Sequence, residues 1–214
     1  MLADRFLAPV RRRPRLPLPL SVLAVWLLAA LAAPAVLASG TAAPVALFVL
    51  LPPLVFLVLL ATSARVQRFV AGLDLRLLTL AQSGRVVGAA LLVLLAVGTL
   101  PAGFALPAGV GDVLIGLSAP LIATLVVPRL PAYRGVYLAW TALGILDLVI
   151  AATTGVLNSP TSLGVLAGAT TTQAMARLPL SLFPTFLVPL ALIMHLQALA
   201  IVSGSAARRA AATA

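Results

Sequence analysis

Apolar residues occupy most of this chain in long stretches, which are separated by short segments that carry arginine. An α-helix needs about 20 apolar residues to cross the hydrocarbon core of a bilayer. Six stretches reach this length, and they cover residues 18–38, 42–61, 86–106, 107–127, 136–157 and 180–202. The pattern predicts an all-α membrane bundle of six transmembrane helices that form one domain over residues 18–203.

The third and fourth stretches are nearly continuous with each other. The segment LPAGFALPAGVGD, residues 100–112, contains two prolines and three glycines. Residues of these types favour a tight turn between two helices. We therefore expect the chain to reverse direction within this segment.

The composition favours a membrane protein over a soluble one. Of the 214 residues, 63% are hydrophobic and 8% are charged, whereas roughly a quarter of the residues of a soluble domain are charged. So few charges cannot cover a soluble fold. The net charge of +10 would suggest nucleic acid as the partner of a soluble domain, but the pattern leaves no such domain. The absence of cysteine excludes disulfides and thiolate metal sites.

The arginines predict the topology of the six helices. With the N-terminus in the cytoplasm, 13 of the 14 arginines lie on the cytoplasmic side, and only Arg177 lies outside. This positive-inside bias requires an even number of crossings and places both the basic segment 1–17 and the tail 204–214 in the cytoplasm. The residue usage is typical of bacteria, so we expect the cytoplasmic (inner) membrane. Arginines expected to set topology or bind anionic lipid headgroups include Arg11, Arg12, Arg13, Arg65, Arg68, Arg76 and Arg85.

The first stretch has an alternative interpretation as a cleaved signal peptide. RRRPR is a basic leading region, and Val36–Ala38 resembles a small-residue cleavage pattern. The apolar run is longer than that of a usual signal peptide, which favours a retained transmembrane helix.

Two connections between the stretches are long enough to have structure of their own. Residues 65–85 place polar and apolar side chains on separate stripes, which predicts an amphipathic helix at the cytoplasmic interface. Lipid anchoring is its expected role, partner binding is the alternative, and Asp74 is expected among its arginines. Residues 158–179 are small and polar, and are expected to form an outside connector or, alternatively, a gate.

Three ionisable residues lie in or at the edge of the predicted helices, and they are the candidates for chemistry: Asp112, Asp147 and His195. Each shares a helical face with small residues, which are typical of close helix packing. With a rise of 1.5 Å per residue, Asp147 lies roughly 17 Å and His195 roughly 11 Å from the cytoplasmic ends of their helices, so the two can pair. Asp112 is expected near the outer surface, in contact with Arg177.

The candidate residues support two classes of function. Because an ionisable group inside a membrane is costly, it is a functional candidate by default, and a proton or cation relay would suit a transporter or channel for a small solute or ion. Buried polar groups also lock helix packing, which would suit a scaffold or accessory subunit. The sequence has no nucleophile elbow, phosphate loop or ligand set for haem or metal, so we expect no enzyme, catalytic residue or cofactor.

The chain also resembles a widespread bacterial family of hypothetical integral membrane proteins over roughly residues 50–200. The resemblance is carried by LDLRLLTLAQSGRVVGAALL (73–92), LPAGFALPAGVGDVLIGLSAPLIA (100–123), LGILDLVIA (143–151) and LPLSLFPTFLVPLALIMHLQAL (178–199). That family has no established activity, so the resemblance implies a membrane location and assigns no residue a role.

Overall fold

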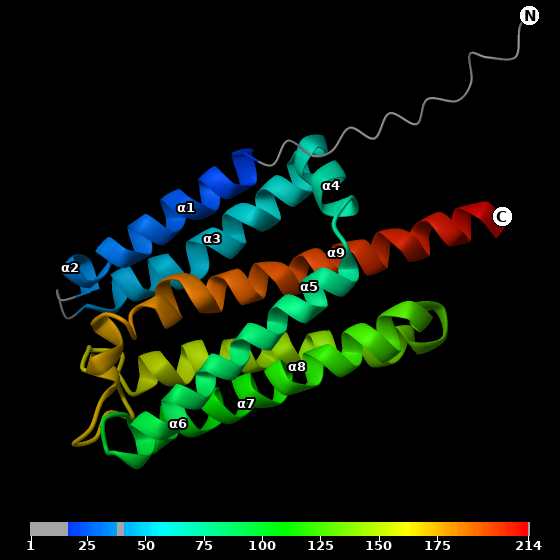
Figure 1. Cartoon of the computed structure of the whole chain (residues 1–214). Coiled ribbons are helices and arrows are strands. Elements are labelled where there is room, and N and C mark those ends of the chain that lie inside the picture. Colours follow the sequence, from blue (N-terminus) through cyan, green and yellow to red (C-terminus); the bar gives the residue numbers. More distant parts are fainter. Residues whose placement is uncertain (1–16, 38–40, 214) are drawn as a thin grey trace, which may run out of the picture.

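The computed structural model describes residues 17–37 and 41–213, which are helical and contain no strands (Figure 1). In chain order the α-helices are α1 (Pro17–Ala32), α2 (Pro34–Leu37), α3 (Ala42–Thr62), α4 (Ala64–Ala71), α5 (Leu75–Ala81), α6 (Ala89–Ala96), α7 (Ala102–Leu121), α8 (Leu130–Leu157) and α9 (Val188–Thr213). Short 3₁₀ segments are η1 (Gln82–Gly88), η3 (Val127–Arg129) and η4 (Thr172–Ala176), and π-helical turns are η2 (Ile122–Val126) and η5 (Phe183–Leu187).

Five stretches of the described residues are long and apolar enough to cross a membrane: Leu20–Leu37, Ala43–Thr62, Leu75–Ala96, Ala102–Leu157 and Phe183–Gly204. The fourth stretch has 56 residues, which as one straight helix would extend about 84 Å. It instead folds back at η3, so that α7 and α8 lie side by side (Figure 1).

The turn before α7 lies earlier in the chain than the sequence pattern predicted. It occupies residues 97–101, where Gly98 has a φ of +74° and Pro101 directly precedes α7. Residues 102–112, which we expected in the turn, form the first half of α7. Glycines of that half, such as Gly109 and Gly111, serve close contacts with neighbouring helices. The predicted helix boundaries at 86–106 and 107–127 are therefore wrong.

The expected single amphipathic helix over residues 65–85 is also wrong. The helix α4 ends at Ala71, and Asp74 begins α5 by accepting hydrogen bonds from the backbone N–H groups of Arg76 and Leu77, at 2.7 and 3.3 Å. Asp74 is thus a helix cap. From there α5, η1 and α6 form one continuous crossing-length stretch, which carries Arg85 into the bundle.

The ends of the chain differ in what the structure describes. The basic segment with Arg11, Arg12 and Arg13 lies outside the described residues, as does Ala38 of the suggested cleavage pattern. At the other end, the tail expected over residues 204–214 continues the backbone of α9 to Thr213.

The exterior of the bundle is apolar and its interior holds polar side chains. Large apolar side chains are exposed along the helices, including Leu54, Val58, Leu114, Leu117 and Leu121. Buried polar side chains include Thr79, Gln82, Arg85, Thr141 and His195. A protein surrounded by water has the opposite distribution. An apolar exterior suits lipid, where polar groups must find partners inside the protein.

The helix α9 lies at the centre and divides the bundle. It packs against α3 and α4 on one side and against α5 and α8 on the other, and α7 packs against η1, α6 and α8 (Figure 1). The helices α1 to α3 thus form one group and α5 to α8 a second group.

Trp26 of α1 supplies a hydrogen bond that Pro189 cannot make. In an α-helix the carbonyl of Thr185 would accept from the N–H of residue 189, which proline lacks. The indole Nε1 of Trp26 donates to that carbonyl oxygen at 3.0 Å, and its ring lies edge-on to Phe186 with ring centres 5.1 Å apart. This contact fastens α1 to η5.

We expect Trp26→Phe to lower the free energy of unfolding by about 1 kcal/mol, the usual contribution of one hydrogen bond. The measurement is thermal unfolding in detergent, followed by circular dichroism. The matched background is Pro189→Ala, whose new N–H takes over the carbonyl of Thr185 and should make Trp26→Phe nearly neutral. An equal loss in both backgrounds would contradict the hydrogen-bond explanation.

Candidate functional site

Arg85 lies inside the helix bundle, so its expected role at the lipid headgroups is wrong. Its side chain is 6% exposed. The segment η1, which carries it, packs directly on α7, and a Cβ at Gly116 would lie 2.7 Å from the backbone nitrogen of Val86. This close approach turns the guanidinium toward α7 and α8. Arg65, Arg68 and Arg76 are exposed, as a headgroup role requires.

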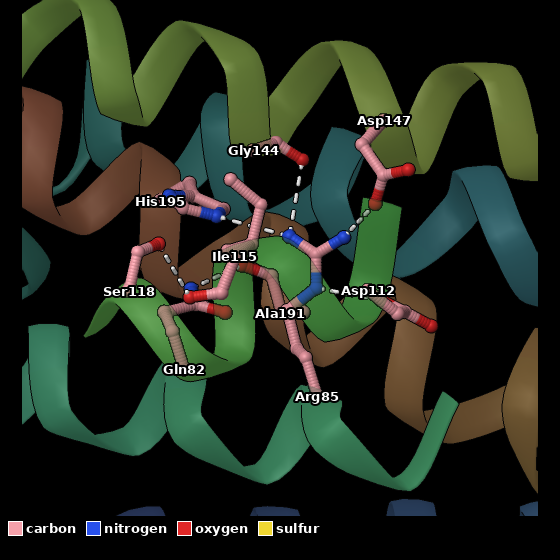
Figure 2. Close-up of polar contacts among 9 residues, drawn as sticks. All are labelled: Gln82, Arg85, Asp112, Ile115, Ser118, Gly144, Asp147, Ala191 and His195. Carbon is pink, nitrogen blue, oxygen red and sulfur yellow. Dashed lines mark hydrogen bonds and ion pairs between the residues drawn. The ribbon is translucent and has the colours of Figure 1, made fainter. Parts of the chain in front are cut away.

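The Arg85 guanidinium joins two acidic side chains from different helices (Figure 2). Its Nε donates to Oδ1 of Asp112 on α7 at 2.7 Å, and its Nη2 donates to Oδ2 of Asp147 on α8. Its Nη1 donates to the carbonyl oxygen of Gly144 at 3.2 Å. Because a buried charge is stable only when it is paired, these contacts explain how an arginine can occupy this position.

His195 of α9 completes the group, which we name the Arg85 cluster: Arg85, Asp112, Asp147 and His195. The imidazole Nε2 lies 3.5 Å from Nη1 of Arg85, and the ring is edge-on to Trp140 at 5.5 Å between ring centres. A guanidinium only donates, so this contact requires Nε2 as the acceptor, which is the neutral imidazole. The expected pair of Asp147 and His195 is thus joined through Arg85.

The expected contact between Asp112 and Arg177 is wrong, because the partner of Asp112 is Arg85. The helix α7 begins five residues earlier than predicted, at Ala102 instead of Pro107. At 1.5 Å per residue this places Asp112 about 7 Å deeper in the bundle. Arg177 is exposed in the 158–182 connection.

Three glycines make room for the polar side chains of the cluster. A Cβ added at any of them would overlap a side chain of the cluster on a neighbouring helix; the pairs are Gly88 with Asp112, Gly111 with Asp147, and Gly144 with His195. Small residues of this kind let helix backbones approach closely. Gly144 belongs to the small-residue face that the sequence places beside Asp147, whereas the pairing of each glycine with a side chain on another helix follows from the fold.

We expect Gly111→Ala to displace Asp147 and to lower the free energy of unfolding by about 1–3 kcal/mol, the usual cost of overpacking. The measurement is thermal unfolding in detergent. The control is Gly135→Ala in α8, where an added Cβ meets no atom within 4 Å and the better helix propensity of alanine should stabilise by about 0.5–1 kcal/mol. Similar effects at both positions would contradict the assigned contact.

A cavity of about 660 Å³ lies beside the cluster. Its walls come from α3 on one side and from α6, α7 and α8 on the other, and Asp112 is part of the wall. The residues 159–161 and 172–177 of the long connection line its outer end. The connection expected as a simple outside segment is therefore part of a cavity, which contacts the cluster through Asp112.

Polar side chains continue from the cluster toward the arginine-rich end of the bundle. The hydroxyl groups of Thr79 and Tyr137 lie 3.0 Å apart, and Nε2 of Gln82 donates to the carbonyl of Ala191 at 3.1 Å. Gln82 lies one helical turn from Arg85. Oε1 of Gln82 and Oγ1 of Thr141 are buried and have no hydrogen-bond partner. Buried polar atoms of this kind are typical binding positions for internal water.

The described residues contain no group of three or more histidine, cysteine or acidic side chains placed to hold a metal ion. In the Arg85 cluster the guanidinium occupies the space between the two carboxylates. The cluster is therefore an organic ion-pair network.

Comparison with known proteins gives one match. The family model described as "Domain of unknown function (DUF8737)" matches residues 42–203. No curated protein and no solved structure matches the chain. The matched range begins with α3 and contains every residue of the Arg85 cluster.

Proposed function

Because the chain belongs to the DUF8737 family, whose description names no activity, we propose its function from the Arg85 cluster and the cavity. The protein is an integral protein of a bacterial cytoplasmic membrane that moves a small solute or ion together with protons. It crosses the membrane six times and keeps both termini in the cytoplasm.

The arrangement of the helices supports this topology. Five stretches are long and apolar enough to cross, and the fourth is a hairpin whose two arms account for two crossings. The helix α4, the turn between α7 and α8, and the end of α9 lie together at one end of the bundle, and the 158–182 connection lies at the other (Figure 1). The first end carries Arg65, Arg68, Arg129 and Arg134, which suits a cytoplasmic face in contact with anionic lipid headgroups.

The observation that carries the proposal is the charge of the cluster. Two carboxylates surround one guanidinium, and the imidazole is neutral, so one negative charge is in excess when both acids are ionised. An uncompensated charge in a low-dielectric interior is unstable. The excess charge is removed by a bound proton or cation, which makes the cluster a binding site for one.

Access from both ends supports movement of the bound proton. The cavity leads from the 158–182 connection to Asp112, and Arg85 connects Asp112 to Asp147. On the other side, Gln82, Thr141 and the Thr79–Tyr137 pair extend the polar interior toward the arginine-rich end. These groups can hold water molecules that pass a proton.

A scaffold or accessory subunit is the second candidate, and the glycine contacts favour it. In that function the cluster ties η1, α7, α8 and α9 together, and Gly88, Gly111 and Gly144 hold its side chains in one arrangement. Such a cluster fixes the packing of the helices without exchanging a proton.

Proton flux separates the two functions. The protein is reconstituted into liposomes that contain a pH-sensitive dye, and a potassium gradient with valinomycin supplies the driving force. We expect dye signals above those of protein-free liposomes, with a further increase when a transported solute is present. Flux equal to that of protein-free liposomes under all these conditions would leave the scaffold function.

A further inference from the structure

The cavity beside the cluster combines an apolar interior with a basic outer end. Its walls are formed largely by apolar side chains, including Val49 of α3, Leu91 of α6, and Phe104 and Ala108 of α7. Phe104, Ala108 and Asp112 follow one another at four-residue intervals, so one face of α7 forms a wall about 12 Å long. An apolar chain of about that length can lie along this wall.

The outer end of the cavity carries a cation without a partner. Arg177 lines the cavity and is exposed, and within the described ranges both ion pairs belong to Arg85. The acidic side chains of those ranges are engaged elsewhere, because Asp112 and Asp147 bind Arg85 and Asp74 caps α5. Gln173 and Thr161 lie on the lining beside this end and add hydrogen-bonding groups. A guanidinium in this position suits a carboxylate or phosphate.

We propose that the cavity binds a single-chain amphiphile with an anionic head group, whose head contacts Arg177 and whose chain lies along α7 toward Asp112. The volume supports one chain, because cavities of about 300–1,000 Å³ are typical of sites for small ligands and this one measures about 660 Å³. The proposal holds whether or not the Arg85 cluster moves protons, since it depends only on the cavity and its outer end.

The test measures binding of radiolabelled dodecanoate to the full-length protein in nanodiscs of phosphatidylcholine, corrected with empty nanodiscs. We expect saturable binding to the wild type, and about tenfold weaker binding to Arg177→Gln, because a charge-assisted hydrogen bond is lost. Binding of uncharged dodecanol should be the same in both. The matched control is Arg134→Gln, which removes an exposed arginine at the other end of the bundle and should leave dodecanoate binding unchanged.

A second variant tests the location of the chain. Ala46 of α3 lines the cavity and is exposed, so Ala46→Trp fills the space without changing the packed core. It should abolish binding of both dodecanoate and dodecanol. Unchanged binding in Ala46→Trp, or in Arg177→Gln, would overturn the site.

Two further ligands test the chemistry of the occupant. Dodecyltrimethylammonium should compete at least tenfold more weakly than dodecanoate, and equal competition would overturn the anionic head group. Phosphatidylglycerol in the nanodiscs should leave dodecanoate binding intact. Displacement of dodecanoate by this lipid in the wild type but not in Arg177→Gln would assign the cavity to a two-chain membrane lipid and overturn the single-chain assignment.

Discussion

Replacing Arg85 by methionine is expected to destabilise the protein by about 3–5 kcal/mol, the cost of leaving buried charges without their partner. Methionine keeps an apolar chain of similar length at the position, so the change mainly removes the guanidinium. Asp112 and Asp147 would then remain in the interior as two acids that no cation compensates. The measurement is thermal unfolding in detergent, together with the yield of folded protein from membranes.

Two variants make the Arg85 experiment specific. The triple variant Arg85→Met with Asp112→Asn and Asp147→Asn removes every charge of the pair network, so it should recover most of the lost stability, because neutral replacements of a buried ion pair are often tolerated. Arg76→Met changes an exposed arginine on α5 and should have an effect within about 0.5 kcal/mol. If the triple variant is as unstable as Arg85→Met, the destabilisation comes from lost packing and not from uncompensated charge.

The second large effect is expected for Asp147→Asn, which should abolish proton flux and leave the fold intact. The amide oxygen can still accept the hydrogen bond from Nη2 of Arg85, so the geometry of the cluster is retained. One guanidinium then faces one carboxylate, and the excess negative charge is gone. We therefore expect a stability equal to or above that of the wild type, whereas the amide takes up and releases no proton.

Flux in proteoliposomes and thermal unfolding are measured on the same preparations of Asp147→Asn. The control is Asp74→Asn, since asparagine caps a helix about as well as aspartate and Asp74 lies outside the cluster. Its flux and stability should match those of the wild type. Undiminished flux in Asp147→Asn would exclude Asp147 as the proton carrier, and unfolding of this variant together with absent wild-type flux would favour the scaffold.

The error at Arg85 shows where the sequence pattern stopped being informative. The stretch Leu75–Ala96 has a mean hydropathy of 1.7, the lowest of the five candidate stretches, because Arg76, Gln82 and Arg85 interrupt it. Read as a local average, it predicts a crossing that begins after Arg85. The arginine is buried because its acidic partners come from residues 27 and 62 positions later in the chain, which a local average does not include.

The sequence alone determined the all-helical class, the crossing-length stretches, and the choice of Asp112, Asp147 and His195 as interior polar residues. Each of these depends on local properties, namely the apolar character of about 20 consecutive residues and the small residues on one helix face. The tertiary structure decided the rest: the turn at Gly98 set the depth of Asp112, η1 brought Arg85 between the two acids, and the separation of α3 from α7 and α8 opened the cavity. These features depend on contacts between distant segments, where the cost of burying one charge is offset only by a partner on another helix.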